Sequence, residues 1–330
     1  MSLCLRRWVG SARSLRGRLH VRDGLPCQDA SRAFGGGTAL ALVADGAGSA
    51  PLAAEGAALV AETVSGLCAE AALWGHPDPG RRILEACREC LQAAAARLDR
   101  PLSHLASTLV LVAVRGGRYL ALNLGDGVVA CLDTGGPRVL LRPRRGEYAN
   151  QTHFLTGPDP WGHLQVAQGP LDGIRAFAVM SDGAAEGLYR RRDGTLAPAL
   201  GRLWAWARQG QTPDRVEQAL DETLLPLLAA RSGDDLSVAL LYGLECPAAA
   251  LEARPLSFRR TVLGVRRSDG LAHRQAVLAR RLAGRAPAEA AADLGLSPAT
   301  VRRHWRALDP LLVARETPPD APDRPTRTSQ

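Results

Sequence analysis

Short apolar runs, several of them followed by an aspartate or a glycine, are the main pattern along the first three quarters of the chain. They predict buried strands, and the helices between them are predicted by apolar residues spaced three and four apart. The predicted strands cover 8–12, 40–44, 108–114, 119–124, 128–132, 177–180 and 236–241. The predicted helices cover 52–71, 80–99, 197–208 and 214–229. Residues 143–173 are polar and rich in Gly and Pro, and predict an irregular flap with one or two short strands.

Successive strands joined by tight turns favour antiparallel pairing, because parallel neighbours need a long crossover between them. Strands in succession between pairs of helices predict a layered α+β protein. At 330 residues the chain is long enough for one large and one small domain.

The positive charge is concentrated near the C-terminus. All 41 basic residues are arginine, and the net charge is +8. Residues 251–310 alone carry 12 Arg against five acids, whereas residues 1–250 carry 26 Arg against 25 acids. The C-terminal part is therefore the candidate for an anionic partner. No run reaches the roughly 18 apolar residues of a membrane span, and no signal peptide is evident, so we expect a cytoplasmic protein without a membrane partner.

Four aspartates flank predicted strands. Asp45, Asp126 and Asp182 follow the apolar segments that begin near 40, 121 and 177, and Asp234 precedes the last one. One such aspartate beside a glycine is most often only a turn. Four of them in one chain predict a shared site for a hard divalent cation, which prefers oxygen ligands.

Six motifs occur in a fixed order: PCQDA, VADGAGSA, AST, NLGDG, MSDGAAEGL and SGDDLSVALL. Together they resemble the metal-dependent protein phosphatases of the 2C type, and most closely a bacterial branch whose N-terminus reads GxxH followed by PCQDA. The resemblance covers about residues 8–243. It implies a fold of two packed, mostly antiparallel sheets flanked by helix pairs.

The resemblance also implies a ligand set. Asp45 resembles the carboxylate that bridges two Mn²⁺ or Mg²⁺ ions, and the Gly46 carbonyl resembles a ligand of one of them. Asp182 and Asp234 match the residues that complete the ligand shell of the second ion. Asp29 matches an acid near the two metal ions. Asp126, with Asp182, matches the site of a third ion.

The chain departs from the family pattern at three positions that concern the site. Better-known members have a phosphate-holding Arg where this chain has His20. His20, or the neighbouring Arg18 and Arg22, is expected to take that role, and His20 is equally suited to protonate the leaving oxygen. In the last motif the family usually has Asp-Asn, so Asp234 is the match and Asp235 stands where Asn is expected. Gly127 stands where many relatives have Ser, a change expected to weaken the third ion site.

After Gly243 the composition changes to an arginine-rich segment. Helices are predicted at about 271–282, 287–294 and 298–308, with Pro at the first position of the second and a Ser297 cap on the third. This arrangement resembles the bacterial helix-turn-helix of sigma-factor and response-regulator type. The last helix is expected to expose four residues to a DNA major groove, with Trp305 in the core. These residues are Thr300, Arg302, Arg303 and Arg306.

The sequence therefore predicts a phosphatase-like domain over 1–245, a linker over 246–270, a small all-α helix-turn-helix domain over 271–312 and a disordered tail over 313–330. The predicted activity is hydrolysis of phosphoserine and phosphothreonine in a phosphoprotein substrate, with His20 and Asp45 as catalytic residues and a cognate kinase as partner. A DNA-associated regulator with a non-catalytic sensor domain and a small-molecule phosphohydrolase stay open as alternatives. The C-terminal domain is expected to bind either DNA or another protein.

Overall fold

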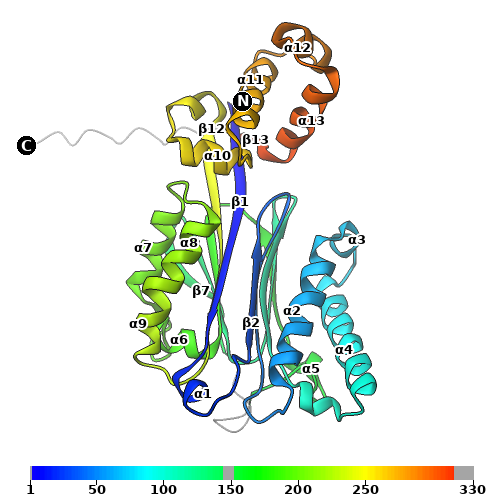
Figure 1. Cartoon of the computed structure of the whole chain (residues 1–330), viewed down its shortest axis with the longest axis vertical. Helices are drawn as coiled ribbons and strands as arrows, with labels where there is room; N and C mark the ends of the chain where they lie inside the picture. The colour runs from blue at the N-terminus through cyan, green and yellow to red at the C-terminus, as the bar shows by residue number, and fades with distance from the viewer. Residues whose placement is uncertain (1, 144–151, 316–330) are drawn as a thin grey trace, which may run out of the picture. The chain divides into compact units, whose positions relative to one another are not determined.

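The structure, a computed structural model, describes residues 2–143 and 152–315 (Figure 1). The chain divides into two compact units. The large unit is Arg7–Leu244, and the small unit combines residues up to Arg6 with those from Glu245 onward. Within the described residues, no helix has both the length and the apolar character needed to cross a bilayer.

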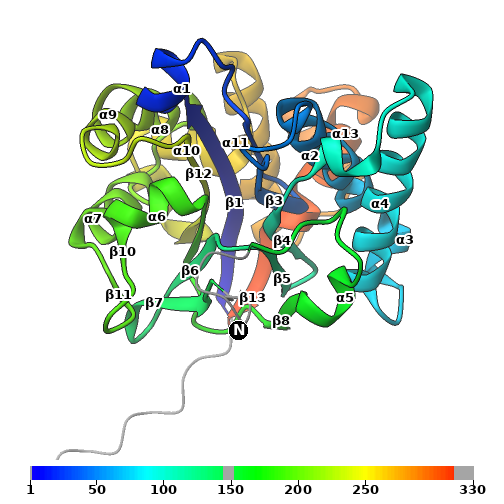
Figure 2. The ribbon, with the colours of Figure 1, turned by 90° about the horizontal axis from the view of Figure 1, so that it is seen from below.

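Two antiparallel sheets form the centre of the large unit (Figures 1 and 2). The first has the strand order β2-β3-β4-β5-β8, and the second contains β1-β12-β9-β6-β7. The strands of the first sheet are β2 (Asp29–Phe34), β3 (Thr38–Asp45), β4 (Leu109–Arg115), β5 (Arg118–Leu124) and β8 (Gln165–Pro170). Those of the second are β1 (Ser2–Leu15), β12 (Leu236–Pro247), β9 (Ala176–Met180), β6 (Val128–Asp133) and β7 (Gly136–Leu141).

Helices cover the outer face of each sheet (Figure 1). The first sheet is flanked by α2 (Ala53–Ala69), α3 (Ala71–Trp74), α4 (Pro79–Leu98), η1 (Leu102–Leu105) and α5 (Pro160–His163). The second is flanked by α6 (Asp182–Leu188), α7 (Pro198–Ala207), α8 (Pro213–Ala219), η2 (Leu220–Leu224) and α9 (Leu225–Ala229). A short hairpin, β10 (Tyr189–Arg190) with β11 (Thr195–Leu196), follows α6.

Strand β3 explains why the apolar runs are continuous rather than alternating. Leu40, Leu42 and Ala44 pack with residues of α2 and α4. The residues between them, such as Ala41 and Val43, pack against the second sheet. Because successive strand residues point to opposite faces and both faces are buried, every position is apolar. The predicted α+β class, with two packed antiparallel sheets flanked by helices, is confirmed.

Several local features differ from the sequence predictions. The first strand is much longer than the predicted 8–12, and residues 18–22 form a short helix, α1 (Arg18–Arg22), that was not expected. Strand β2 was also not expected. In the predicted flap, β8 agrees with the short strands expected there, whereas α5 was not expected, and residues 144–151 lie outside the described residues.

In the small unit, α11 (Ser268–Leu282), α12 (Pro287–Leu294) and α13 (Pro298–Leu308) lie where helices are expected. Gly295 ends α12 with φ 61°, and the Thr300 amide donates to the Ser297 Oγ (3.2 Å) at the start of α13. His304 is buried, whereas Trp305, expected in the core, is half-buried beneath the Arg281 guanidinium.

The rest of the small unit has more regular structure than the sequence predicts. The segment 246–270, expected as a linker, contains η3 (Ala248–Ala253) and α10 (Leu256–Leu263). After η4 (Asp309–Leu311), β13 (Leu312–Arg315) pairs antiparallel with Ser2–Leu5 of β1. The unit is therefore not purely helical, and part of the expected tail is a strand. Residues 316–330 of that tail lie outside the described residues.

Candidate active site

Aspartates from four strand ends line one pocket in the large unit. Single carboxylate oxygens of Asp45, Asp126 and Asp182 lie within 4.8 Å of one another. Asp234 lines the same pocket. Asp45 ends β3, Asp126 follows β5, Asp182 begins α6 after β9, and Asp234 stands two residues before β12, so both sheets contribute.

Backbone and side-chain contacts on both sides fix the turn after Asp45. The Asp45 amide donates to the Thr108 Oγ1 (3.0 Å), and the Thr108 amide donates to the Asp45 carbonyl (2.8 Å). The Gly46 amide donates to the Gln28 carbonyl (3.1 Å). A Cβ on Gly46 would lie 2.5 Å from the Ala53 carbonyl oxygen, so only glycine allows this close approach to the start of α2.

Asp29 lies behind this cluster. It pairs directly opposite Asp45 in the β2–β3 ladder and is only 9% exposed. Its Oδ2 is buried and has no hydrogen-bond partner among the described residues. Asp29 does not line the pocket, so it is next to the predicted metal pair and outside the open site.

Burial and mutual repulsion make these carboxylates reluctant to ionise. Burial, together with the charges of nearby aspartates, raises the pKa of Asp29 to about 7 and that of Asp182 to about 6. The pKa of Asp45 is raised by burial and by the charges of Asp29 and Asp182, and the pKa of Asp234 is raised by burial. Grouped acids of this kind are costly unless cations neutralise them.

The donor set fits a hard divalent cation. The converging ligand atoms are carboxylate oxygens, and the pocket lining contains no cysteine. Its one histidine, His20, hydrogen-bonds to Asp235 and is not part of the oxygen cluster. Asp45, Asp126, Asp182 and Asp234 are thus the residues able to hold cations here, and the Gly46 carbonyl borders the same pocket.

The three basic candidates near the N-terminus are placed differently. His20 lines the pocket. Arg22 is exposed and pairs with Asp23 (2.7 Å), and the Arg18 Nε donates to the Ser232 carbonyl (3.4 Å). Neither arginine lines the pocket, so His20 is the basic side chain that the structure brings to the aspartates.

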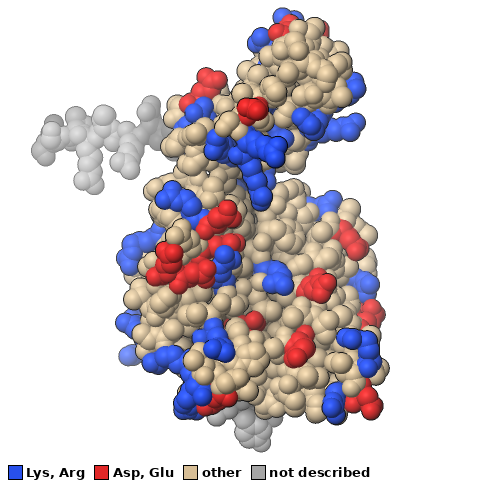
Figure 3. Space-filling model, viewed as in Figure 1, with Lys and Arg blue, Asp and Glu red and all other residues tan. Residues whose placement is uncertain are grey.

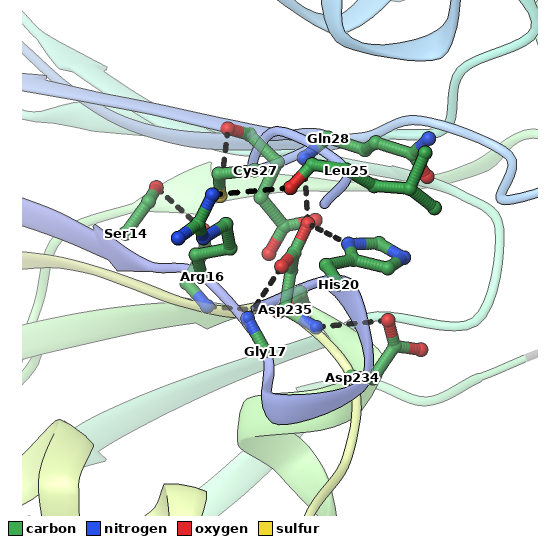
Figure 4. Close-up of polar contacts among 12 residues, drawn as sticks. Ser14, Arg16, Gly17, His20, Leu25, Cys27, Gln28, Asp234 and Asp235 are labelled. Carbon is green, nitrogen blue, oxygen red and sulfur yellow. Dashed lines mark hydrogen bonds and ion pairs between the residues drawn. The ribbon is translucent and has the colours of Figure 1, made fainter. Parts of the chain in front are cut away.

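Seven residues that line the pocket were not predicted as site residues, among them Gln28, Thr152 and Asp235. Gln28 is nearly buried, and its Oε1 has no partner among the described residues. The Thr152 hydroxyl donates to Asp126 Oδ2 (2.7 Å). Asp235, noted only as a departure from Asn, is 2% exposed and accepts three hydrogen bonds (Figure 4). The PCQDA motif was the available signal for Gln28, whereas Thr152 lies in the poorly patterned flap.

A second group of candidate residues lies on α13 in the small unit. Arg302, Arg303 and Arg306 are exposed, and no carboxylate of the described chain lies within 4.0 Å of their guanidinium groups. Thr300 is only half-exposed, and its hydroxyl hydrogen-bonds to that of Ser297 (2.9 Å). By contrast, arginines of α11 form ion pairs, such as Arg281 with Asp309 (2.6 Å). Figure 3 shows arginine side chains projecting from the C-terminal helices on the face drawn.

Comparison with known proteins gives a consistent result. The sequence pattern of the family described as protein phosphatase 2C matches residues 16–225. Serine/threonine-protein phosphatase 3 of Escherichia coli (strain K12) is 30% identical over 161 residues. That match covers 46% of this chain and 63% of the length of the E. coli protein.

Two solved structures share the fold. PppA, described as a key regulatory component of T6SS in Pseudomonas aeruginosa, aligns with a TM-score of 0.53 at 20% identity, over 73% of this chain and 100% of PppA. The catalytic domain of the serine threonine protein phosphatase PstP, in complex with two manganese ions, aligns with a TM-score of 0.50 at 20% identity. That alignment covers 72% of this chain and 99% of the PstP chain.

Proposed function

The chain belongs to the protein phosphatase 2C family, and on that premise we propose that it hydrolyses phosphoserine and phosphothreonine in proteins with the help of Mn²⁺ or Mg²⁺. The observation that carries the proposal is the convergence of the Asp45, Asp126 and Asp182 oxygens in one open pocket. Two cations held by Asp45, Gly46, Asp182 and Asp234 are the proposed set, and Asp126 with Asp182 is the proposed site of a third. The two manganese ions of the PstP structure support this assignment.

The protein's part in the reaction is to hold charge and to position groups. When bound, a pair of divalent cations supplies positive charge to the phosphoryl oxygens and acidifies the attacking water. Asp45 is the proposed shared ligand because it lies opposite Asp29 and beside Asp182. Thr152 restrains Asp126, and the Gly183 amide restrains Asp182 (2.6 Å), so both carboxylates are oriented before a ligand arrives.

Hydrolysis of synthetic phosphopeptides by the full chain tests the activity. We expect turnover with Mn²⁺ or Mg²⁺ and none in EDTA. Asp45→Asn should lower turnover at saturating Mn²⁺ by at least about 100-fold, because ligand charge is worth several kcal/mol in the transition state. The matched control is Asp193→Asn on the exposed β10–β11 turn, which should leave turnover unchanged.

Other outcomes identify the alternatives. Hydrolysis of small phosphate esters without hydrolysis of phosphopeptides indicates a small-molecule phosphohydrolase. Binding of Mn²⁺ without any turnover indicates a sensor domain. An Asp45→Asn variant as active as the parent contradicts the proposed metal centre.

A second proposed function is DNA binding by the small unit, in which α12 and α13 act as a helix-turn-helix. Its support is a contrast within the described chain: Arg302, Arg303 and Arg306 on α13 have no ion pair there, whereas Arg280 and Arg281 of α11 do. Guanidinium groups without carboxylate partners are available for phosphates and for guanine edges. The competing hypothesis is that the same face of α13 binds another protein.

Fluorescence anisotropy distinguishes the two hypotheses. It measures binding of duplex DNA by the full chain at several salt concentrations. Affinity should fall by about 0.9 log units per log unit of salt for each phosphate neutralised. Arg302→Ala with Arg303→Ala should weaken binding and flatten that slope. The control pair, Arg266→Ala with Arg267→Ala, removes the same charge from exposed positions before α11 and should change both much less. If the full chain does not bind duplex DNA even at low salt, the DNA-binding hypothesis is excluded.

A further inference from the structure

The carboxylate of Asp235 is the meeting point of three segments of the large unit (Figure 4). Its Oδ1 accepts from the Gly17 amide (2.6 Å), and its Oδ2 accepts from the Gln28 amide (2.6 Å). The same Oδ2 lies 2.9 Å from His20 Nδ1. Asp235 itself is 2% exposed, so these contacts are made away from bulk water.

These contacts determine which nitrogen of His20 faces the substrate. A carboxylate with two backbone N–H groups directed at it is held as an acceptor, so Nδ1 must be the donor in the third contact. Nε2 is then left for the pocket, which His20 lines together with Asp45 and Asp234. The N-terminal side of α1 is fixed as well, because a Cβ on Gly17 would collide with the backbone of Asp234.

The two residues in contact are two of the three departures from the family pattern described above, and they are 215 positions apart in the sequence. By that resemblance, His20 stands where better-known members have a phosphate-holding arginine, and Asp235 stands where asparagine is expected. An arginine needs no acceptor behind it to carry its charge, whereas a histidine needs one to fix its tautomer. The joint change is therefore chemically coherent.

This pairing favours one of the two roles open to His20. A phosphate clamp requires net positive charge, and Asp235 cancels the charge of a protonated His20. A proton donor requires a fixed ring with one nitrogen directed at the reacting atoms, which is what the pairing supplies.

Resting on the proposed phosphatase activity, we infer that Asp235 is a positioning residue that keeps a proton on His20 Nδ1, so that the protonated ring donates its second proton, on Nε2, to the leaving serine or threonine oxygen and is left as the neutral Nδ1–H tautomer. In that step the water oxygen bonds to phosphorus and the P–O bond to the side chain breaks. The bonding electron pair passes to the leaving oxygen, which takes the proton from Nε2. The proton lost by the water returns to Nε2, and the products are the free hydroxyl and inorganic phosphate.

A double-mutant cycle on the full chain with Mn²⁺ tests the kinetic part. His20→Ala and Asp235→Asn should each lower kcat for a phosphoserine peptide by about 100-fold or more, the usual range for a general acid. Both should lower kcat for 4-nitrophenyl phosphate by less than about 10-fold, since that leaving group departs without a proton. The double variant should be no slower than His20→Ala, because Asp235 acts through His20. Asp23→Asn, the same change at an exposed position of the same segment, should have no effect.

Nitrogen-15 NMR of histidine-labelled full chain, kept metal-free at pH 8.5, tests the positioning part without any turnover. The signal absent from His20→Ala should show the Nδ1–H tautomer in the parent protein and should change toward Nε2–H in Asp235→Asn. If the parent protein hydrolyses no phosphate ester, the phosphatase proposal fails while this measurement still decides the tautomer.

Three results overturn the inference. One is a parent His20 in the Nε2–H form. Another is a double variant slower than His20→Ala by the full factor of Asp235→Asn, which would mean that Asp235 acts independently of His20. The third is an equal loss on peptide and aryl substrates, which would return His20 to phosphate binding.

Discussion

Replacing Asp182 with Asn should stabilise the metal-free protein and lower its affinity for Mn²⁺. In the folded chain, burial and the charges of Asp126 and Asp234 raise the pKa of Asp182 to about 6 from an ordinary value of 3.8. As pH rises, the unfolded chain loses this proton first. The carboxylate therefore destabilises the folded state increasingly between about pH 4 and pH 6, and fully above that.

The expected gain in the free energy of unfolding follows from the difference between the folded and unfolded pKa values of Asp182. One pKa unit corresponds to about 1.4 kcal/mol, so this difference limits the gain to about 3 kcal/mol. Asp182 is only half-buried, and solvent screening reduces the effect to about 1–2 kcal/mol. Asparagine keeps the oxygen that accepts from the Gly183 amide, so little is lost in exchange. In a unit of this size the gain corresponds to a rise in Tm of about 2–8 °C.

Thermal unfolding of the parent and of Asp182→Asn, in EDTA from pH 4 to pH 8, measures this directly. The two Tm values should agree near pH 4 and separate as pH rises, with the variant higher. Excess Mn²⁺ should reverse the order at pH 8, because only the parent keeps the full ligand charge. Asp193→Asn is a control for which we expect the opposite effect, a lower Tm than the parent at pH 8, because the Arg190 ion pair lowers the pKa of the Asp193 carboxylate. A metal-free Asp182→Asn less stable than the parent at pH 8 would refute the electrostatic reasoning.

Three further outcomes are expected. Mn²⁺ should raise the Tm of the parent more at pH 8 than at pH 5.5, because protons on Asp45 and Asp182 compete with the cation. Gly46→Ala should unfold at lower temperature and lose Mn²⁺ affinity measured by calorimetry, because its Cβ would displace the Ala53 carbonyl. Ser297→Ala should destabilise the small unit by about 1 kcal/mol in denaturant unfolding, since it removes the cap on α13, and an unchanged midpoint would contradict that role.

The sequence was most informative where both faces of an element are buried. The run from Leu40 to Ala44 is apolar at every position, because one set of side chains meets helices and the other meets a second sheet. Strand β2 (Asp29–Phe34) has no such pattern: its side chains alternate irregularly, and its position is fixed by the ladder with β3. Periodicity therefore found the interior strands and missed the edge strands β2 and β7.

The site shows a similar division. Asp45, Asp126, Asp182 and Asp234 could be named in advance because each stands at the end of a readable strand. The role of Asp235 could not, because its partners Gly17, His20 and Gln28 lie at the start of α1 and just before β2, where motifs mark the residues but no apolar periodicity shows that they meet. Likewise, the helical pattern of α13 did not show that His304 rather than Trp305 is buried.

The pairing of Ser2–Leu5 with β13 has a consequence for biosynthesis. Of the described chain, Ser2–Leu5 leaves the ribosome first and Leu312–Arg315 last. Nearly everything else must be translated before this ladder can form, which makes it among the most sequence-distant contacts of the fold. Residues Ser2–Leu5, including the apolar Leu5, therefore have an unpaired strand edge while the large unit folds. A nascent chain stalled before β13 is consequently the form that we expect to aggregate and to require chaperones.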